Sequence, residues 1–127
     1  MSVPPRDYSV LGVVLAGVVE ALGAGEQAEK AARKAGERLG RAHRERGQDV
    51  AGALRERGYE PYARGDRLRM RNCPFHVLSL EEPVLVCSMN LALCQGLLEG
   101  LGEDPARAAL EARPGECCVS LSKTNVD

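Results

Sequence analysis

Apolar residues dominate the first predicted element of this chain. Their spacing is helical through most of the first half of the sequence. Val10–Val19 is an uninterrupted apolar run of ten residues, which predicts a buried helix over residues 8–22. Asp7 can cap this helix, and Gly23-Ala24-Gly25 is expected to stop it. A second helix is expected over residues 26–46, where small residues recur at steps of three and four: Ala28, Ala31, Ala32, Ala35, Leu39 and Ala42.

The middle of the chain changes from helical to alternating spacing. Asp49 is expected to cap a short helix over residues 50–57 that Gly58 ends. Residues 59–62 and 67–71 then flank Arg64-Gly65-Asp66, which indicates a hairpin. Leu68 and Met70 alternate with arginines, as on a half-buried strand, and Asn72-Cys73-Pro74 breaks this strand.

The last third predicts one long helix and a second strand pair. The helix is expected to start near Glu82-Pro83, to run to about Leu101 and to bury one face, formed by Val84, Leu85, Leu91, Leu97, Leu98 and Leu101. Strands are expected over residues 106–112 and 117–122. The order α-α-α-β-β-α-β-β predicts an α+β fold, in which helices pack on a small antiparallel sheet. At 127 residues, the chain is expected to be a single domain, residues 1–127.

Two of these segments have alternative explanations. The small-residue stripe at 28–42 lets helices approach closely, and the run at 10–19 is strongly apolar. Both can form contacts of a homodimer or with another domain, or both can pack on the sheet of their own chain. The sequence leaves these alternatives open.

Composition and charge exclude some functions. The chain has no Trp, one Phe and three Tyr, which argues against a base-stacking surface for single-stranded nucleic acid. Residues 30–71 carry 13 Lys and Arg against six Asp and Glu, but the acidic residues are interleaved, so we expect a solvated surface and no direct DNA contact. The apolar run is half the length of a membrane span, and Arg6 beside Asp7 is a poor start for a signal peptide. We therefore expect a cytoplasmic protein with no membrane partner and with reduced cysteines.

The five cysteines carry the candidate chemistry. Their odd number excludes a fully paired set of disulfides within one chain. Cys73, Cys87 and Cys117 each lie near the end of a predicted element, so they can form one cluster, whereas adjacent Cys117 and Cys118 would point to opposite faces of a strand. Cys94 sits in an apolar helical segment and is expected to fill the core. For the others, metal ligation and simple packing are equally open.

One histidine extends this set. Cys73 and His76 form a Cys-x-x-His pair, a spacing that can chelate a metal ion, so His76 is a possible additional ligand. The same two residues could form a nucleophilic dyad, which would make the protein a thiol enzyme using Cys73. No Gly-x-Ser-x-Gly, phosphate-binding loop or dinucleotide-binding motif is present. We therefore expect no enzyme and keep the thiol enzyme as an alternative.

Three motifs resemble a known family: Asn72-Cys73-Pro74-Phe75-His76, Pro83-Val84-Leu85-Val86-Cys87 and Gly115-Glu116-Cys117-Cys118-Val119. Together, over residues 72–119, they are similar to the C-terminal sensor domain of ArsR-like helix-turn-helix regulators, in the group of the repressor of the Suf iron–sulfur assembly operon. The resemblance implies a regulatory ligand- or redox-sensing domain, with Cys73, Cys87 and Cys117 or Cys118 as ligands of an iron–sulfur cluster or zinc. Phe75 and Met89 are candidates for an effector pocket.

The chain departs from this family in two respects. It starts at Met1 without the winged helix, so DNA would be bound only through a separate winged-helix domain, and the chain is either a fragment or a stand-alone sensor. Residues 95–116 also lack a further cysteine that the family carries, which leaves zinc or no metal as alternatives to a cluster. The expected partners are a second copy, as a homodimer, and a small-molecule effector. The alternative is a stand-alone small-molecule-binding protein of the same fold, with structural cysteines.

Overall fold

The computed structural model describes residues 8–123 and confirms the α+β class. The four strands form one antiparallel sheet in the order β1-β2-β4-β3. The expected element order is confirmed except for one added short helix. The elements are α1 Ser9–Leu22, α2 Gly25–Glu45, α3 Val50–Glu56, β1 Pro61–Arg64, β2 Arg67–Met70, α4 His76–Glu81, α5 Pro83–Gly100, the 3-10 turn η1 Pro105–Arg107, β3 Ala108–Leu110 and β4 Val119–Ser122.

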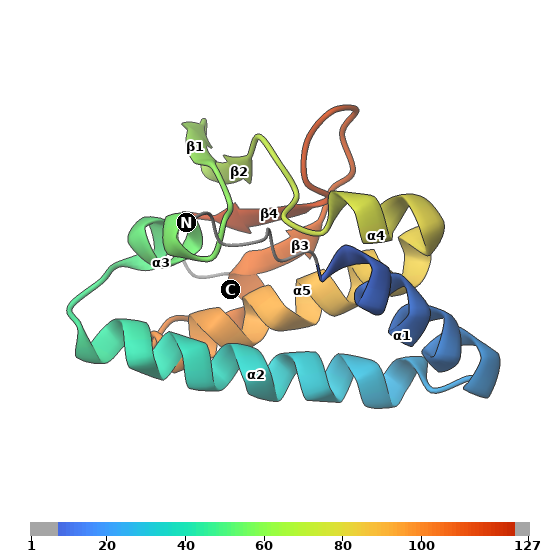
Figure 1. Ribbon diagram of the computed structural model, residues 1–127. Helices are drawn as coiled ribbons and strands as arrows, with labels where there is room; N and C mark the ends of the chain where they lie inside the picture. The colour runs from blue at the N-terminus through green and yellow to red at the C-terminus, as the bar shows by residue number, and fades with distance from the viewer. Residues whose placement is uncertain (1–7, 124–127) are drawn as a thin grey trace, which may run out of the picture.

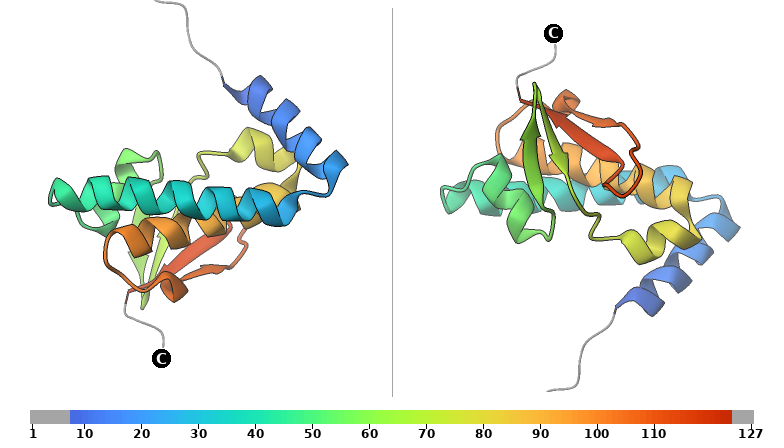
Figure 2. Two further views of the ribbon diagram at one scale, coloured as in Figure 1. Left: turned by 90° about the horizontal axis from the view of Figure 1, so that it is seen from below. Right: turned by 90° about the horizontal axis from the view of Figure 1, so that it is seen from above.

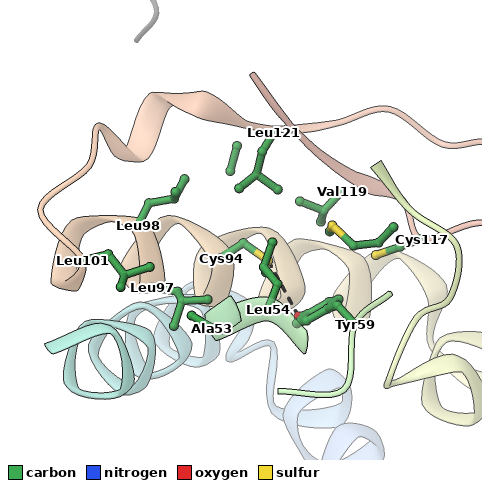
Figure 3. Close-up of a cluster of buried hydrophobic side chains, with 12 residues drawn as sticks. Ala53, Leu54, Tyr59, Cys94, Leu97, Leu98, Leu101, Cys117, Val119 and Leu121 are labelled. Atoms are coloured by element: carbon green, nitrogen blue, oxygen red, sulfur yellow. Dashed lines mark hydrogen bonds between the residues drawn. The ribbon is translucent and has the colours of Figure 1, made fainter. Parts of the chain in front are cut away.

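Helix α5 is the centre of the fold. It lies between the sheet on one side and α2 on the other, with α1 and α4 near its N-terminal end (Figures 1 and 2). Figure 3 shows the main core, where α5, α3 and β4 meet. The fully buried side chains there include Leu54, Met70, Leu98, Val119 and Leu121. By length and composition α5 could also cross a membrane, but half of it is buried within the domain, as in a core helix.

Helices α2 and α5 run side by side in the same direction and touch through glycines. A Cβ atom added at Gly36 would lie 2.3 Å from the carbonyl oxygen of Leu93, and one added at Gly96 would lie 2.1 Å from that of Arg33. Gly40 and Gly100 repeat this close approach one turn later. The expected close helix contact therefore exists within the chain, and glycines make it, since only they let the two backbones meet.

The first helix is where the structure corrects the sequence analysis most. Residues 8–22 were expected to form a buried helix, but Ala16 is the one buried residue of α1. Apart from Glu20, this helix is apolar on all sides, and it contacts the rest of the domain mainly at α4. Most of its other large side chains, and the preceding Tyr8, stay in solvent, with 48–75% of each exposed: Tyr8, Val10, Leu11, Val14, Leu15, Val18 and Leu22.

The expected helix boundaries are largely confirmed. Asp49 caps α3 by accepting a hydrogen bond from the backbone of Gly52 at 2.8 Å, and Gly23 ends α1 in the left-handed region. Pro83 occupies the first turn of α5. The expected cap Asp7 lies outside the described residues. Helix α4 was missed because its six residues are too few to show a helical period.

Two expectations about side-chain burial are wrong. Val84 was placed on the core face of α5, but it is 80% exposed, because the first turn of the helix buries its other side, at Leu85 and Val86. Arg69 was placed on a solvated face of its strand, but it is 3% exposed. Its guanidinium pairs with Glu116 at 3.1 Å and donates to the backbone oxygen of Glu111 at 2.7 Å, so the charge is buried with partners.

The strands are shorter than expected. The first begins at Pro61, so Tyr59 precedes the sheet and is buried instead under α5. The last begins at Val119, two residues later than the sequence indicates. This second difference leaves Cys117 and Cys118 in the connection before β4, and it changes how the candidate site is built.

Candidate functional site

The four candidate ligands lie together at one end of α5. Cys73 follows β2, Cys87 lies in the second turn of α5, and Cys117 and Cys118 immediately precede β4. Cys117 is 1% exposed, and the other three are half-buried. The fold thus brings together thiols that are up to 45 positions apart in the sequence, because the ends of β2 and β4 meet the start of α5.

The thiols interact as a row. Cys117 interacts with both Cys73 and Cys118, and Cys118 also interacts with Cys87. We name this set, Cys73-Cys117-Cys118-Cys87, the thiol row. The expectation that adjacent Cys117 and Cys118 point to opposite faces of a strand is not met. It assumed strand geometry, in which neighbouring side chains alternate, whereas both residues lie ahead of the strand.

A single amide ties the row to the core. Asn90, which is 2% exposed, donates from Nδ2 to the sulfur of Cys117 at 3.2 Å, and the same nitrogen lies 4.0 Å from the sulfur of Cys73. Its Oδ1 accepts a hydrogen bond from the hydroxyl of Tyr59. Both polar ends of the Asn90 side chain are therefore occupied, and the amide holds the two sulfurs against the core.

The fifth cysteine belongs to the core, as expected. Cys94 is 1% exposed, and its sulfur lies 3.7 Å from the hydroxyl of Tyr59 (Figure 3). Burial raises the pKa of the Cys94 thiol to about 12, so this cysteine stays protonated at neutral pH.

The electrostatics of the row single out Cys117. Hydrogen bonding from Cys118 and Cys73 lowers the pKa of Cys117 well below its ordinary value, and the Asn90 amide adds to this effect. The interaction with Cys117 raises the pKa of Cys73 and of Cys118. One thiolate with two protonated thiol neighbours is the charge state that this arrangement favours.

The donor set fits a metal in chemistry but not in geometry. Thiolates are the ligands that zinc and iron–sulfur clusters prefer. Among residues 8–123, however, no group of three or more His, Cys, Asp or Glu side chains is arranged to hold a metal ion. His76, the possible additional ligand, is exposed at the start of α4. The thiols of the row therefore interact in pairs and do not converge on a single point.

A cavity lies directly beside the row. It has a volume of about 350 Å³ and is walled by α1, α2, α4 and α5 together with Phe75. The two effector-pocket candidates, Phe75 and Met89, both line it. The other lining residues are Gly12, Leu15, Ala16, Val19, Ala32, Leu78, Val86, Asn90 and Leu93.

The sequence analysis missed Asn90 and Tyr59. Asn90 did leave a signal: it is the one amide inside the apolar stretch from Pro83 to Cys94, three residues after Cys87 and four before Cys94. That spacing places the amide on the same helical side as both cysteines. Tyr59 left no comparable signal, since it read as the first residue of a strand.

Comparisons of this chain with known protein families, with curated proteins and with solved structures find no match. The resemblance to the sensor domains of ArsR-like regulators therefore stays a prediction. The case for a function rests on the thiol row, on Asn90 and on the cavity.

Proposed function

We propose that this chain is a redox-sensing domain of a transcriptional regulator, with the thiol row as its sensing element. The observation that carries the proposal is the pairing of Cys117 with Cys73: the Asn90 amide contacts both sulfurs, and interaction with the neighbouring thiols lowers the pKa of Cys117. Redox-sensing cysteines combine thiolate character with a neighbouring cysteine that resolves the oxidised state. DNA binding, in this proposal, belongs to a separate winged-helix domain.

The reaction that fits the row is disulfide formation with a hydroperoxide as the oxidant. The Cys117 thiolate attacks the peroxide; an S–O bond forms, the O–O bond breaks, and the departing hydroxide takes up a proton to become water. Cys73 then loses its proton and attacks the resulting sulfenic acid; an S–S bond forms and a second water leaves. Two thiols lose two electrons, and the peroxide gains them. Since Cys117 is 1% exposed, the oxidant must be a small molecule, such as hydrogen peroxide.

Disulfide formation would change the structure around the connection after β2 and around Asn90. Cys73 ends the β1–β2 hairpin and Cys117 leads into β4, so their bond would pin the connection after β2 to the sheet and displace the amide of Asn90. The buried amide would lose its sulfur acceptor, which carries a free-energy penalty of about 1–3 kcal/mol. A penalty of that size can bias an equilibrium between two arrangements.

Zinc or iron–sulfur ligation by the same row is the second candidate. The observation that favours it is the gathering of four soft donors from three separate segments. The metal-bound protein requires the cysteine side chains to rotate so that three sulfurs face one point. Anaerobically purified protein distinguishes the candidates: brown protein with iron and sulfide supports a cluster, one zinc per chain supports a zinc site, and metal-free protein supports the thiol switch.

The homodimer stays part of the proposal. The solvent side of α1 presents Val10, Leu11, Val14 and Val18, and no charged residue interrupts Ser9–Val19. Two such helices can cover each other's apolar side chains, and an isologous contact of this kind is the commonest route to a dimer. A second copy is therefore the partner that we assign to this face.

The test is a count of free thiols after exposure to one equivalent of hydrogen peroxide, in reduced, metal-free protein. We expect the five thiols of the chain to fall to three, with no change in the mass of the chain beyond the loss of two hydrogens. Cys117→Ser should abolish the loss, whereas Cys94→Ala, the matched change of a buried cysteine outside the row, should retain it. Five remaining thiols in the wild type, or loss that persists in Cys117→Ser, would overturn the redox switch.

A further inference from the structure

We propose that the cavity beside the thiol row binds a small, uncharged, apolar molecule and that Asn90 transmits its presence to the thiols. This inference names a ligand class for the sensor proposed above. Its coupling step rests on that proposal, whereas the binding step does not.

The wall of the cavity sets the ligand class. Ten of its eleven lining residues are apolar or glycine, and none carries a charge. An ion placed there would lose its hydration without gaining a partner, and this penalty excludes charged ligands. The volume of about 350 Å³ falls at the lower end of the range for small-molecule sites, so the occupant has the size of one or two rings.

The one polar wall residue gives the ligand little to bind. Asn90 already donates to the sulfur of Cys117 and accepts from the hydroxyl of Tyr59. A ligand hydroxyl or amide would have to displace one of these buried partners. The cavity therefore selects for apolar surface, and burial of that surface supplies the affinity.

The cavity and the thiol row share their chain segments. Cys73 belongs to the row, and Phe75, two residues later, lines the cavity. On α5, the cavity wall includes Val86, which directly precedes Cys87 of the row. Met89 and Asn90, shortly after Cys87, belong to the same wall. A ligand that moves this wall by a few tenths of an ångström also moves the atoms that hold the sulfurs.

Helix α1 forms the wall that can adjust. It contributes Leu15, Ala16 and Val19, and most of its other side chains lie in solvent. It approaches α4 closely at Gly12, where an added Cβ would lie 2.6 Å from a methyl group of Leu78. A helix held along one side opens at lower cost than one packed on two sides, so α1 offers the ligand its entry.

Naphthalene and 1-naphthoate test the ligand class, since they share a ring system and differ in one negative charge. In equilibrium dialysis against reduced, metal-free protein, we expect naphthalene to bind and 1-naphthoate to bind at least tenfold more weakly. Ala16→Phe should fill the cavity and weaken naphthalene binding at least tenfold. Ala21→Phe makes the same change at an exposed alanine of the same helix, outside both the cavity and the proposed dimer face, and should leave binding unchanged.

The rate of alkylation of Cys117 by iodoacetamide tests the coupling. Saturating naphthalene should change this rate by about fivefold in the wild type and in Ala21→Phe, and should leave it unchanged in Ala16→Phe. Absence of naphthalene binding, or equal binding of 1-naphthoate, would overturn the ligand class. Binding with an unchanged alkylation rate would overturn the coupling. Neither result depends on peroxide, so the failure of the redox switch would be seen separately.

Discussion

The contact between α2 and α5 makes the fold sensitive to a single methyl group at Gly96. An alanine Cβ there would lie 2.1 Å from the backbone oxygen of Arg33 and 2.9 Å from the backbone nitrogen of Glu37, distances that real structures essentially never show. The atoms it meets belong to the backbone, so no side chain can rotate to make room. The two helices would have to separate by about 1 Å, and their whole shared face would lose its close packing.

The change in the free energy of unfolding of Gly96→Ala follows from two opposing effects. Inserting a methyl group into a tight contact costs about 3 kcal/mol where the backbone itself must move. Replacing glycine by alanine in a helix returns about 1 kcal/mol through its higher helix propensity. The free energy of unfolding should therefore fall by about 2 kcal/mol, which lowers Tm by about 8 °C for a domain of this size.

Thermal and urea unfolding followed by circular dichroism measure this effect, and Gly17→Ala is the matched control. Gly17 lies within α1, and nothing comes within 4 Å of a Cβ built on it, so the control should gain up to about 1 kcal/mol. If Gly96→Ala were as stable as Gly17→Ala, the close approach of α2 and α5 would be refuted.

Three further changes test other parts of the structure. Asp49→Ala removes the cap that accepts from Gly52 and should cost about 1 kcal/mol in urea unfolding, whereas Asp49→Asn should cost less than half of that; equal losses would contradict the cap. Leu11→Gln, on the solvent side of α1, should shift sedimentation from dimer to monomer, and an unchanged sedimentation coefficient would argue against this dimer face. Because the pKa of Cys117 is lowered, its thiolate persists as pH falls, and its alkylation in metal-free protein should keep most of its rate from pH 8 down to pH 6. A steep decline, typical of a free cysteine, would contradict the stabilisation of this thiolate by the thiol row.

Local signals were sufficient to predict most of the fold. The cap at Asp49, the left-handed glycine Gly23 and the proline at the start of α5 each act through the nearest turn of backbone, so the sequence shows them directly. The register of β2 was readable for the same reason, since Met70 is buried as alternation requires. The alternation misjudged Arg69, because its burial depends on carboxylates more than forty residues away.

Burial of an apolar helix was harder to predict than its existence. Val10–Val19 defines a helix by composition, but only tertiary contacts decide how many of its faces are covered. The glycine contact between α2 and α5 also depends on tertiary structure. The small-residue stripe indicated that α2 approaches another helix closely, but the partner could be named only once Gly36 and Gly96 were seen to meet.

The candidate site was predictable as a set of residue types and not as an arrangement. The predicted element ends indicated Cys73, Cys87 and Cys117, and the family resemblance added Cys118 as an alternative to Cys117. The order of the thiols depends on β4 beginning at Val119, a boundary of the kind that sequence patterns define least well. The role of Asn90 follows from that boundary, since its amide reaches the sulfur of Cys117 just ahead of β4 and the sulfur of Cys73 after β2.

The most direct test of the central claim identifies the disulfide that one equivalent of hydrogen peroxide forms in the reduced, metal-free protein. Cleavage after arginine and glutamate separates Cys73 from Cys87 at Glu81 and Glu82, so mass spectrometry can assign the linked peptides. The account predicts a bond between Cys73 and Cys117 that survives in Cys118→Ser and is lost in Cys117→Ser. A bond that involves Cys94, or five free thiols after oxidation, would contradict it.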